Sequence, residues 1–427
     1  MIDIKLIRES PEIVRENIKK KFQNDKLPLV DKVIKLDEEW RKVKYEEDKL
    51  RSDRNSLSKQ ISEAKKSKKD DSALMKKAKE IPEEIEKLGE KKTKLEEEIK
   101  KIMMTIPNII HDSVPLGKND LENKEIKKFG EPKVPAYEIK HHAEIAEGNG
   151  WADFDSARET SGNGFYYLTG DLAILHEALL AFARDFMIKQ GFEYVIPPFM
   201  IRRKVVEGVM SFKEMDAMMY KIDGEDLYLI GTSEHSMIGR FIDKTLNGKK
   251  LPITLTSYSP CFRKEVGSHG MEEKGLYRLH QFEKQEMIVI CEPEDSYKWY
   301  EKMLQFTVDV FRELNIPVRT LECCSGDLAD LKAKSADVEA WSPRQKKYFE
   351  VGSCSNLTDA QARRLNIRIE GKGKIYFGHT LNNTVLASPR ALIAFLENNQ
   401  QKDGSIKIPE ALQPYMFGKK VIGKKEK

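Results

Sequence analysis

The feature that most constrains the fold is a heptad pattern that runs twice between about residues 31 and 103. In each run apolar residues are spaced alternately by three and four, and a 3.5-residue spacing kept over this length indicates supercoiled helices. The first run has its apolar seam positions at Val33, Leu36, Trp40, Val43, Leu50, Leu57, Ile61 and Ala64. The second run has them at Leu74, Ala78, Ile81, Ile85, Leu88, Leu95, Ile99 and Ile102.

Both seams contain polar residues, and a polar turn separates them. Glu47 and Arg54 occupy seam positions in the first run, and Lys92 does so in the second. With the turn at 65–72, the simplest prediction is an antiparallel helical hairpin whose legs are each roughly 50 Å long, at 1.5 Å per residue. Pro82 falls inside the second run and predicts a kink or a local break there.

Two uses of such an arm remain open on these residues alone. The usual one is a dimerising coiled coil or a solvated spacer. The lysines at the turn and along both legs favour a second use, which is contact with the phosphate backbone of RNA. The net charge of the whole chain is only +4, so the chain as a whole has no basic field that demands a nucleic acid.

The composition bounds the remaining possibilities. A chain of 427 residues can form one large or two medium domains. Its five cysteines show no CxxC pairing and no zinc-finger spacing to histidine, so we expect reduced thiols in a cytoplasmic protein. The sequence contains no signal-peptide pattern and no apolar run of transmembrane length. The P-loop, Rossmann and zincin motifs are also absent.

The pattern from about residue 151 onward is mixed α/β. An amphipathic helix is predicted over 171–190 and is followed by Gly191. A strand at 192–198 ends in two prolines, which places it at a sheet edge or an interface. Short turns separate the later strand-like runs and no regular crossover helices occur, so we expect an antiparallel sheet.

The last strong helix is predicted over 388–400. Ser388 is expected to be its N-cap, with Pro389 at the first helical position and Arg390 in the first turn. An arginine near a helix N-terminus is unfavourable with the helix dipole, which favours a functional role for Arg390.

A hairpin formed by a strand-like run that ends at 263–265 and a second run at 280–286 carries the most specific chemical signal. One strand-like run ends at Arg263, and the returning run spans 280–286. Alternation predicts that His280, Phe282, Lys284 and Glu286 share one face, with roughly 13 Å between Phe282 and Glu286 at about 3.3 Å per residue. Adenine could stack on Phe282 while Glu286 receives an ammonium group, and Arg263 would offer a planar fork to a phosphate. Taken alone, an ordinary amphipathic hairpin with a salt-bridged outer face fits these residues equally well.

Several motifs in this order resemble the class II aminoacyl-tRNA synthetases. The helix leading into 191–198 resembles the first motif of that class, which builds the dimer interface. Residues 262–265 with 279–282 resemble the second motif, and 386–390 resemble the third. More narrowly, 231–234, 280–286, 350–356 and 361–364 resemble the seryl-tRNA synthetase family, and the similarity covers essentially the whole chain.

This resemblance implies an α+β fold with two functional parts. An N-terminal antiparallel coiled-coil hairpin, within a tRNA-binding domain at 1–112, would precede a linker at 113–150. A class II catalytic domain at 151–427 would be built on an antiparallel β-sheet flanked by helices. The resemblance also implies a homodimer.

The resemblance further assigns site residues. Arg263 and Arg390 would be catalytic, acting as electrostatic clamps on the phosphates. The serine site would comprise Thr232, Ser233, Glu234, Glu286 and Thr384. The ATP site would comprise Arg263, Lys264, Glu265, Arg278, Phe282, Glu350, Val351, Gly352, Ser353 and Arg390. Glu350 and Ser353 would hold Mg²⁺, which prefers oxygen donors, and no zinc is expected.

Two positions depart from the pattern frequent in bacterial members of the family. Thr384 stands where a serine-containing Asn-Gly-Ser-Gly motif is common, so the hydroxyl is kept and a methyl is added. Gly352 stands where serine is frequent, although the hydroxyl of Ser353 remains. Read structurally, Glu265 and Glu286 could be ordinary ion-pair partners, and Thr384 could cap a turn.

The implied function is the ATP-dependent ligation of serine to tRNA(Ser), and to tRNA(Sec) where it exists. ATP is expected as a substrate, L-serine as the amino acid and Mg²⁺ as the metal. One rival is a related ligase that loads an amino acid onto a carrier protein, but those enzymes lack the arm and use cysteine-bound zinc. The other rival is an inactive paralogue that serves as a binding or scaffold protein.

Overall fold

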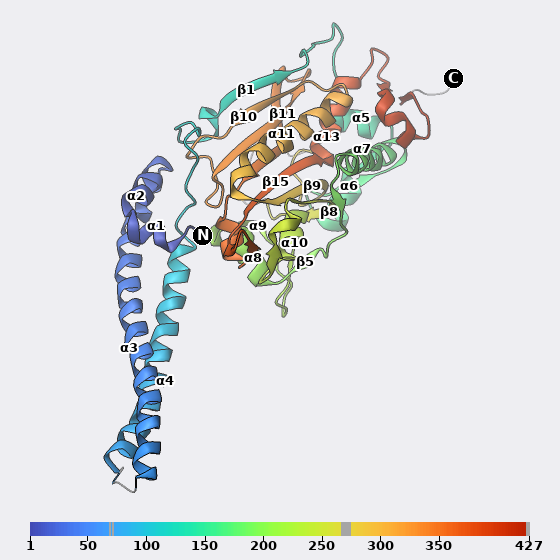
Figure 1. Cartoon of the computed structure of the whole chain (residues 1–427). Helices are drawn as coiled ribbons and strands as arrows, with labels where there is room; N and C mark the ends of the chain where they lie inside the picture. The colour runs from blue at the N-terminus through green and yellow to red at the C-terminus, as the bar shows by residue number, and fades with distance from the viewer. Residues whose placement is uncertain (68–69, 71, 266–274, 424–427) are drawn as a thin grey trace. The chain divides into compact units, whose positions relative to one another are not determined.

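The N-terminal part of the chain is a long helical hairpin. In the computed structural model, which describes residues 1–427 except 68–69, 71, 266–274 and 424–427, residues Ile2–Pro107 form one compact unit and Asn108–Lys427, with Met1, form another. The first unit contains α1 (Ile4–Glu9), α2 (Pro11–Lys20), η1 (Asn24–Lys26), α3 (Leu27–Lys66) and α4 (Ser72–Met103). Helices α3 and α4 run side by side, which confirms the predicted hairpin (Figure 1). Lys68, Lys69 and Asp71 of the predicted turn lie outside the described residues.

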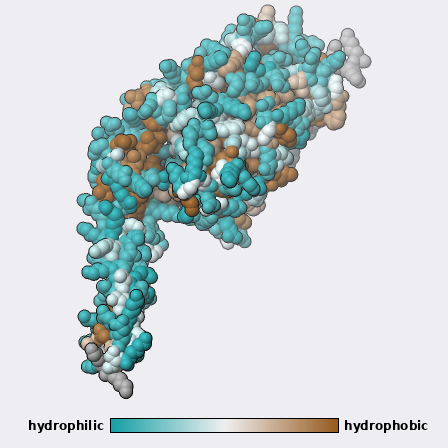
Figure 2. Space-filling model, viewed as in Figure 1, coloured by the Kyte–Doolittle hydropathy of each residue, from teal (hydrophilic) through white to brown (hydrophobic). Residues whose placement is uncertain are grey.

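The buried residues of the hairpin follow the heptad pattern. Val33, Val43, Leu57, Ile85 and Leu95 are all less than a tenth exposed. The side of the hairpin seen in Figure 2 is predominantly hydrophilic, because the apolar side chains are turned into the seam between the helices. The seam therefore supplies the apolar contact that holds the hairpin together.

Two of the three polar seam residues bind one another. The carboxylate of Glu47, only 2% exposed, forms an ion pair with Lys92 of α4 and another with Arg51 one turn along α3. The third, Arg54, is exposed. The break predicted at Pro82 is wrong, because α4 continues through that residue as one helix. Proline removes a single backbone hydrogen bond, and the packing of α4 against α3 continues on its C-terminal side at Ile85.

The second unit is built on an eight-stranded sheet in the order β1-β10-β11-β12-β15-β9-β8-β4. Every neighbouring pair is antiparallel except β4 with β8, so the predicted antiparallel sheet is confirmed. The strands are β1 (Lys124–Phe129), β4 (Glu193–Tyr194), β8 (Ile253–Phe262), β9 (Gln281–Cys291), β10 (Val318–Glu322), β11 (Lys334–Ser342), β12 (Lys347–Asn356) and β15 (His379–Ala387).

Three long helices cover one face of this sheet. Helices α7 (Gly170–Lys189), α11 (Ser296–Glu313) and α13 (Ser388–Asn399) pack on its central strands (Figure 1). Alternate residues of β9 point to opposite faces: Met287 and Val289 join the core under these helices, whereas Ile288 and Ile290 join a second core with α10 (Ser233–Gly239). The site described below lies on this second face of β9.

Smaller elements complete the unit. The helices are α5 (His142–Gly148), α6 (Phe154–Ser161), α8 (Arg203–Val209), α9 (Phe212–Met218), α12 (Ala360–Arg364), η2 (Asp120–Glu122), η3 (Gly248–Lys250), η4 (Pro293–Asp295) and η5 (Glu410–Met416). The strands are β2 (Ala152–Asp153), β3 (Tyr167–Leu168), β5 (Met200–Ile201), β6 (Tyr228–Leu229), β7 (Thr245–Asn247), β13 (Arg368–Gly371), β14 (Lys374–Tyr376), β16 (Ile406–Lys407) and β17 (Val421–Ile422).

The stretch 113–150, expected to be a linker, contains structural elements of the second unit. It supplies β1, which forms one edge of the large sheet, and α5. Nearly all residues of β1 are exposed, so the strand lacks the apolar alternation by which a strand is recognised in a sequence.

Two local predictions had different outcomes. The segment 192–198 does lie at a sheet edge, but only Glu193–Tyr194 form a strand there. The predicted N-cap of α13 is wrong: the helix begins at Ser388 with Ala387 as its cap, and the Ser388 hydroxyl instead contacts the side chain of His176. Among the described residues, no helix is long and apolar enough to cross a membrane.

Candidate active site

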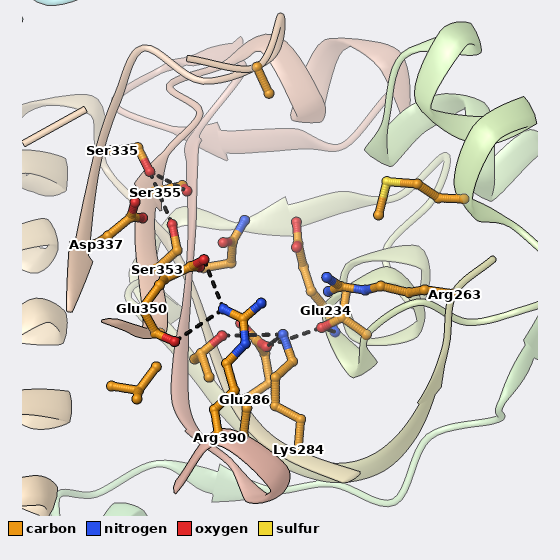
Figure 3. A pocket seen from close by; sticks show the side chains of 18 of the residues that line it. Glu234, Arg263, Lys284, Glu286, Ser335, Asp337, Glu350, Ser353, Ser355 and Arg390 are labelled. Atoms are coloured by element: carbon orange, nitrogen blue, oxygen red, sulfur yellow. Dashed lines mark hydrogen bonds and ion pairs between the residues drawn. The ribbon is translucent and has the colours of Figure 1, made fainter. Parts of the chain in front are cut away.

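A cavity of about 460 Å³ opens on the face of β9 that α7 does not cover. Residues of β9, β12 and β15 line it together with residues at the starts of α10 and α13, and Figure 3 shows several of these side chains. The predicted site residues that line it are Thr232, Glu234, Arg263, Glu265, Arg278, Phe282, Glu286, Glu350, Val351, Gly352, Ser353, Thr384 and Arg390. One cavity thus gathers residues that are up to 158 positions apart in the chain, from 232 to 390.

Strand alternation brings three side chains of β9 into the cavity. Phe282, Lys284 and Glu286 all line it, in agreement with the predicted shared face. His280 does not line it, because β9 begins at Gln281 and the alternation does not extend back to residue 280. The Nδ1 atom of His280 instead lies 3.0 Å from the Tyr220 hydroxyl and 2.9 Å from the carbonyl oxygen of Arg263.

One end of the cavity is acidic and deeply buried. The hydroxyl of Thr232 donates to Glu286 at 3.1 Å, and Lys284 forms an ion pair with the same carboxylate. Lys284 also donates to the Thr384 hydroxyl at 3.2 Å. The carboxylate of Glu286 therefore already has a cation and a hydroxyl of the protein as partners.

The second acid at this end is Glu234. Burial and the nearby charge of Glu286 raise the pKa of Glu234 to about 7, while a hydrogen bond from Gln361 opposes that rise. The Gln361 amide donates to the Glu234 carboxylate at 2.9 Å. This end of the cavity can bind a small cation such as an ammonium group, since Glu234 has no positively charged partner in direct contact among the described residues.

The other end presents an aromatic ring and arginines. The guanidinium of Arg263 lies 5.2 Å from the centre of the Phe282 ring and donates to the carbonyl oxygen of Gly231 at 3.2 Å. Arg278 is half exposed and lies 3.4 Å from Glu265. A flat ring beside fixed guanidinium groups can hold a purine base and its phosphates.

Arg390 enters the cavity from the first turn of α13. Its guanidinium donates to the Glu350 carboxylate at 2.9 Å and to the Glu350 carbonyl oxygen at 3.1 Å, and it lies 5.1 Å from the Tyr277 ring (Figure 3). These contacts hold the cation inside the cavity against the unfavourable helix dipole.

The donors expected for Mg²⁺ lie together on neighbouring strands. Glu350 and Ser353 are on β12, and Asp337 faces Ser353 across the pairing of β11 with β12. Burial and the charge of Glu350 raise the pKa of Asp337 to about 6. A group of hard oxygen donors in which one carboxyl group is held partly protonated by its surroundings fits a divalent cation. The thiol of Cys323 and carboxylates of Asp327 and Asp337 also lie within 4.8 Å of one another in this cavity.

Two predicted site residues lie outside the cavity. Ser233 is fully buried, and its hydroxyl points to the carbonyl oxygen of Ser257 at 3.4 Å. Lys264 points to the carbonyl oxygen of Asp216 at 3.5 Å. Each is the chain neighbour of residues that do line the cavity. Ser233 begins α10 and its side chain lies on another side of that helix than Glu234, whereas Lys264 follows the end of β8.

Sequence reasoning also missed contributors to the site. Lys284 lies on the face that strand alternation predicts, but the alternation does not indicate that its charge pairs with Glu286. Gln361 belongs to the family-like motif at 361–364, but only the fold brings it to Glu234. Asp337 carried no local signal, because its closeness to Ser353 depends on the pairing of two strands.

The two departures from the bacterial pattern are neighbours in space. A Cβ atom at Gly352 would lie 3.5 Å from the Cβ atom of Thr384 and 3.3 Å from its carbonyl oxygen. Glycine at 352 therefore avoids a close contact of a side chain with the carbonyl oxygen of Thr384.

An antiparallel sheet flanked by helices, with the hairpin arginine, the aromatic ring and the helix-borne arginine around one cavity, defines the class II aminoacyl-tRNA synthetases. Comparisons with known proteins agree. Residues 218–399 match the family described as tRNA synthetase class II core domain (G, H, P, S and T), and residues 1–110 match the seryl-tRNA synthetase N-terminal domain.

Individual relatives are similar over the whole chain. The serine–tRNA ligase of Methanocella arvoryzae is 46% identical, over 98% of this chain and 99% of its own. The crystal structure of seryl-tRNA synthetase from Pyrococcus horikoshii complexed with ATP superposes with a TM-score of 0.93 at 41% identity, covering 99% of each chain. The cytoplasmic serine–tRNA ligase of Naegleria fowleri in complex with AMP gives 0.88 at 33%, covering 100% of this chain and 99% of its own. The chain belongs to the seryl-tRNA synthetase family.

Proposed function

We propose that this protein is a serine–tRNA ligase. It activates L-serine with ATP to seryl-adenylate and transfers the seryl group to the 3′ end of tRNA(Ser), and of tRNA(Sec) where the cell has one. The observation that supports this most directly is the polarity of the cavity, with buried carboxylates at one end and arginines beside an aromatic ring at the other. These two ends suit an amino acid and a nucleotide.

The acidic end binds serine. Glu286 is already paired with Lys284, so the serine ammonium is attracted chiefly to the Glu234 carboxylate. The hydroxyls of Thr232 and Thr384 lie close to these charged groups and hydrogen-bond the polar atoms of the substrate. A site that hydrogen-bonds a substrate hydroxyl rejects the analogue that lacks it, so alanine binds poorly.

The opposite end binds ATP. Adenine stacks on Phe282 and its amino group reaches Glu265, while Arg278 and Arg390 hold the terminal phosphates and Arg263 holds the α-phosphate. Val351 and Gly352 line the nucleotide site. Ser233 and Lys264 support their cavity-lining neighbours, because their own side chains point to the backbone carbonyl oxygens of Ser257 and Asp216.

The chemistry requires no side-chain nucleophile. A carboxylate oxygen of serine forms a bond to the α-phosphorus of ATP, and the bond from that phosphorus to the bridging oxygen breaks, releasing pyrophosphate. Arg263 and Arg390 stabilise the charge that develops, so catalysis is positioning and electrostatics. The terminal adenosine hydroxyl of the tRNA then attacks the carbonyl carbon of the adenylate, and AMP leaves.

Glu350 and Ser353 are the residues that would hold Mg²⁺. The bound ion would neutralise phosphate charge. In the structure Arg390 pairs with Glu350, and this contact keeps the carboxylate oriented toward the cavity.

The wider assignments rest on the family and on the shape of the two units. Residues 1–112 bind tRNA through the α3–α4 arm, which contacts the RNA backbone and reads its shape. Residues 151–427 are catalytic, with 113–150 supplying an edge strand and a short helix. The protein acts in the cytoplasm as a homodimer through the edge at 192–198, where Ile196 is 80% exposed. Light scattering tests the dimer.

Amino-acid-dependent ATP–pyrophosphate exchange tests the proposed function. Wild-type protein is expected to exchange with serine and at least 100-fold less with alanine or glycine. Arg263→Ala should lower the exchange rate by about 10²–10³-fold, the usual effect of removing one oriented transition-state donor. Arg312→Ala, at an exposed arginine of α11, is the matched control and should behave as wild type. Folded wild-type protein that exchanges with no amino acid in the presence of Mg²⁺ would refute the proposal.

A further inference from the structure

The face of β9 that points away from the cavity carries a buried carboxylate. Side chains alternate along a strand, so Glu283 points toward α7 while Phe282 and Lys284 face the cavity. The Glu283 side chain is only 12% exposed. One of its oxygens accepts a hydrogen bond from the Tyr166 hydroxyl and lies 3.2 Å from Nε2 of His176. A charged group in this position, behind the nucleotide site, has no role in the chemistry described above.

His176, on α7, joins this carboxylate to a second element. Its Nε2 atom also lies 2.7 Å from the hydroxyl oxygen of Ser388, which is completely buried at the start of α13. That hydroxyl does not cap the helix and contacts the imidazole instead. Arg390, two residues further on, reaches the cavity. One imidazole therefore contacts both the strand that carries Phe282 and the helix that carries Arg390.

The charges around His176 favour its protonated form. Glu177 on its own helix lies 3.4 Å from Nδ1 but is 73% exposed, whereas Glu283 faces Nε2 from the interior. Burial opposes the imidazolium, but the two glutamates outweigh it and raise the pKa of His176 to about 9. Tyr166 and Tyr258 also face Glu283, and burial with its charge raises the pKa of each phenol, that of Tyr258 to about 12.

We propose that His176 is a positioning residue for ATP binding, acting as an imidazolium that links Glu283 to Ser388 and so sets the placement of Phe282 relative to Arg390. This inference rests on the proposed function, because it assigns the nucleotide to the cavity between those two residues. Loss of the imidazolium charge weakens both contacts at once. The strand and the helix then lose a shared anchor on α7, while the serine end, built from Thr232, Glu234 and Glu286, is left unchanged.

The test is the affinity for ATP, measured by calorimetry between pH 7.5 and 10 without serine, so that the amino acid's own ammonium does not titrate in the assay. Wild-type affinity should fall about 5- to 10-fold as the pH rises through 9. His176→Gln should bind ATP about 10-fold more weakly at pH 8, with no further loss up to pH 10. Its KM for serine in pyrophosphate exchange should stay within twofold of wild type. His111→Gln, at a histidine whose ring contacts Ser113 and Tyr297, is the matched control.

A second variant keeps the proposal falsifiable if His176→Gln does not fold. Glu283→Gln removes the charge but keeps the shape of the side chain, so it should move the loss of ATP affinity to lower pH. Wild-type affinity that is constant from pH 8 to 10, or a Glu283→Gln profile that coincides with wild type, would overturn the role of His176. These outcomes are separate from a failure of the proposed function, which would appear as absent serine-dependent exchange.

Discussion

At the scale of single residues, the surrounding fold changes the ionisation of Glu234. Its carboxyl group is enclosed near Glu286, and burial with that neighbouring charge raises its pKa to about 7. In an empty pocket near neutral pH, a large fraction of molecules therefore carry the protonated, neutral acid. Serine arrives as an ammonium cation and binds the ionised form better, so its binding is coupled to release of a proton.

This coupling predicts a pH-dependent KM for serine. Below pH 7 the acid is mostly protonated in the free protein, so each further unit of acidification should raise the KM for serine about tenfold, while above pH 8 the KM should level off. Gln361→Leu removes a donor that lowers the pKa of Glu234, so the rise should begin at higher pH. Pyrophosphate exchange over varied serine, from pH 5.5 to 8.5, measures both. A KM that is flat across this range would contradict the assignment of Glu234 as the ammonium partner.

At the scale of elements, the α3–α4 hairpin contains a buried ion pair where its seam is otherwise apolar. Glu47 is buried and bound by both Lys92 and Arg51. A buried pair of this kind adds little net stability, but removing one partner leaves an uncompensated charge. Its value to the protein is that it fixes the register of the two helices, since only one alignment brings Glu47 opposite Lys92.

Replacing only one of Glu47 and Lys92 should therefore destabilise the hairpin more than replacing both. Lys92→Leu should destabilise the hairpin by about 1–2 kcal/mol, below the usual cost of breaking a buried pair because Lys92 is 27% exposed and Arg51 remains. The double variant with Glu47→Leu should be at least as stable as wild type. Hydrogen–deuterium exchange of α3 and α4 in the full chain measures both. A double variant less stable than Lys92→Leu would show that the pair itself holds the arm together.

At the scale of the whole molecule, the chain consists of two compact units, Ile2–Pro107 and Asn108–Lys427 with Met1. The cavity is formed entirely by residues of the larger unit, from Val209 to Arg390. The smaller unit contributes no residue to the cavity lining among the described residues. The two proposed activities, adenylate formation and tRNA binding, are therefore assigned to different units.

Removal of residues 2–107 should separate these activities. The shortened protein is expected to keep serine-dependent pyrophosphate exchange within about threefold of the full chain, because every lining residue remains. Its rate of tRNA aminoacylation at limiting tRNA should fall at least 100-fold, because the arm's phosphate contacts are lost. Circular dichroism confirms that the shortened protein is folded. Equal aminoacylation by both proteins would rule out the arm as the tRNA-binding element.

Repeating patterns in the sequence were sufficient to predict the elements whose residues repeat regularly. The heptads predicted α3 and α4, because a helical seam buries residues at a fixed spacing. Strand alternation predicted the shared face of Phe282, Lys284 and Glu286, and it was wrong for His280, where the strand has not yet begun. The polar strand β1 was missed, because an edge strand buries too little to leave an alternation.

The sequence by itself determined the helical arm, the antiparallel class of the sheet and most of the residues that line the cavity. Only the tertiary structure decided which buried charges meet. Lys92 with Glu47, Gln361 with Glu234, and His176 with Glu283 and Ser388 are contacts between segments separated by 45 to 212 positions. Such pairs depend on the register of strands and the packing of helices, and no local spacing encodes them. The ionisation of Glu234 and His176 is likewise decided by this packing, since burial and neighbouring charge set a pKa.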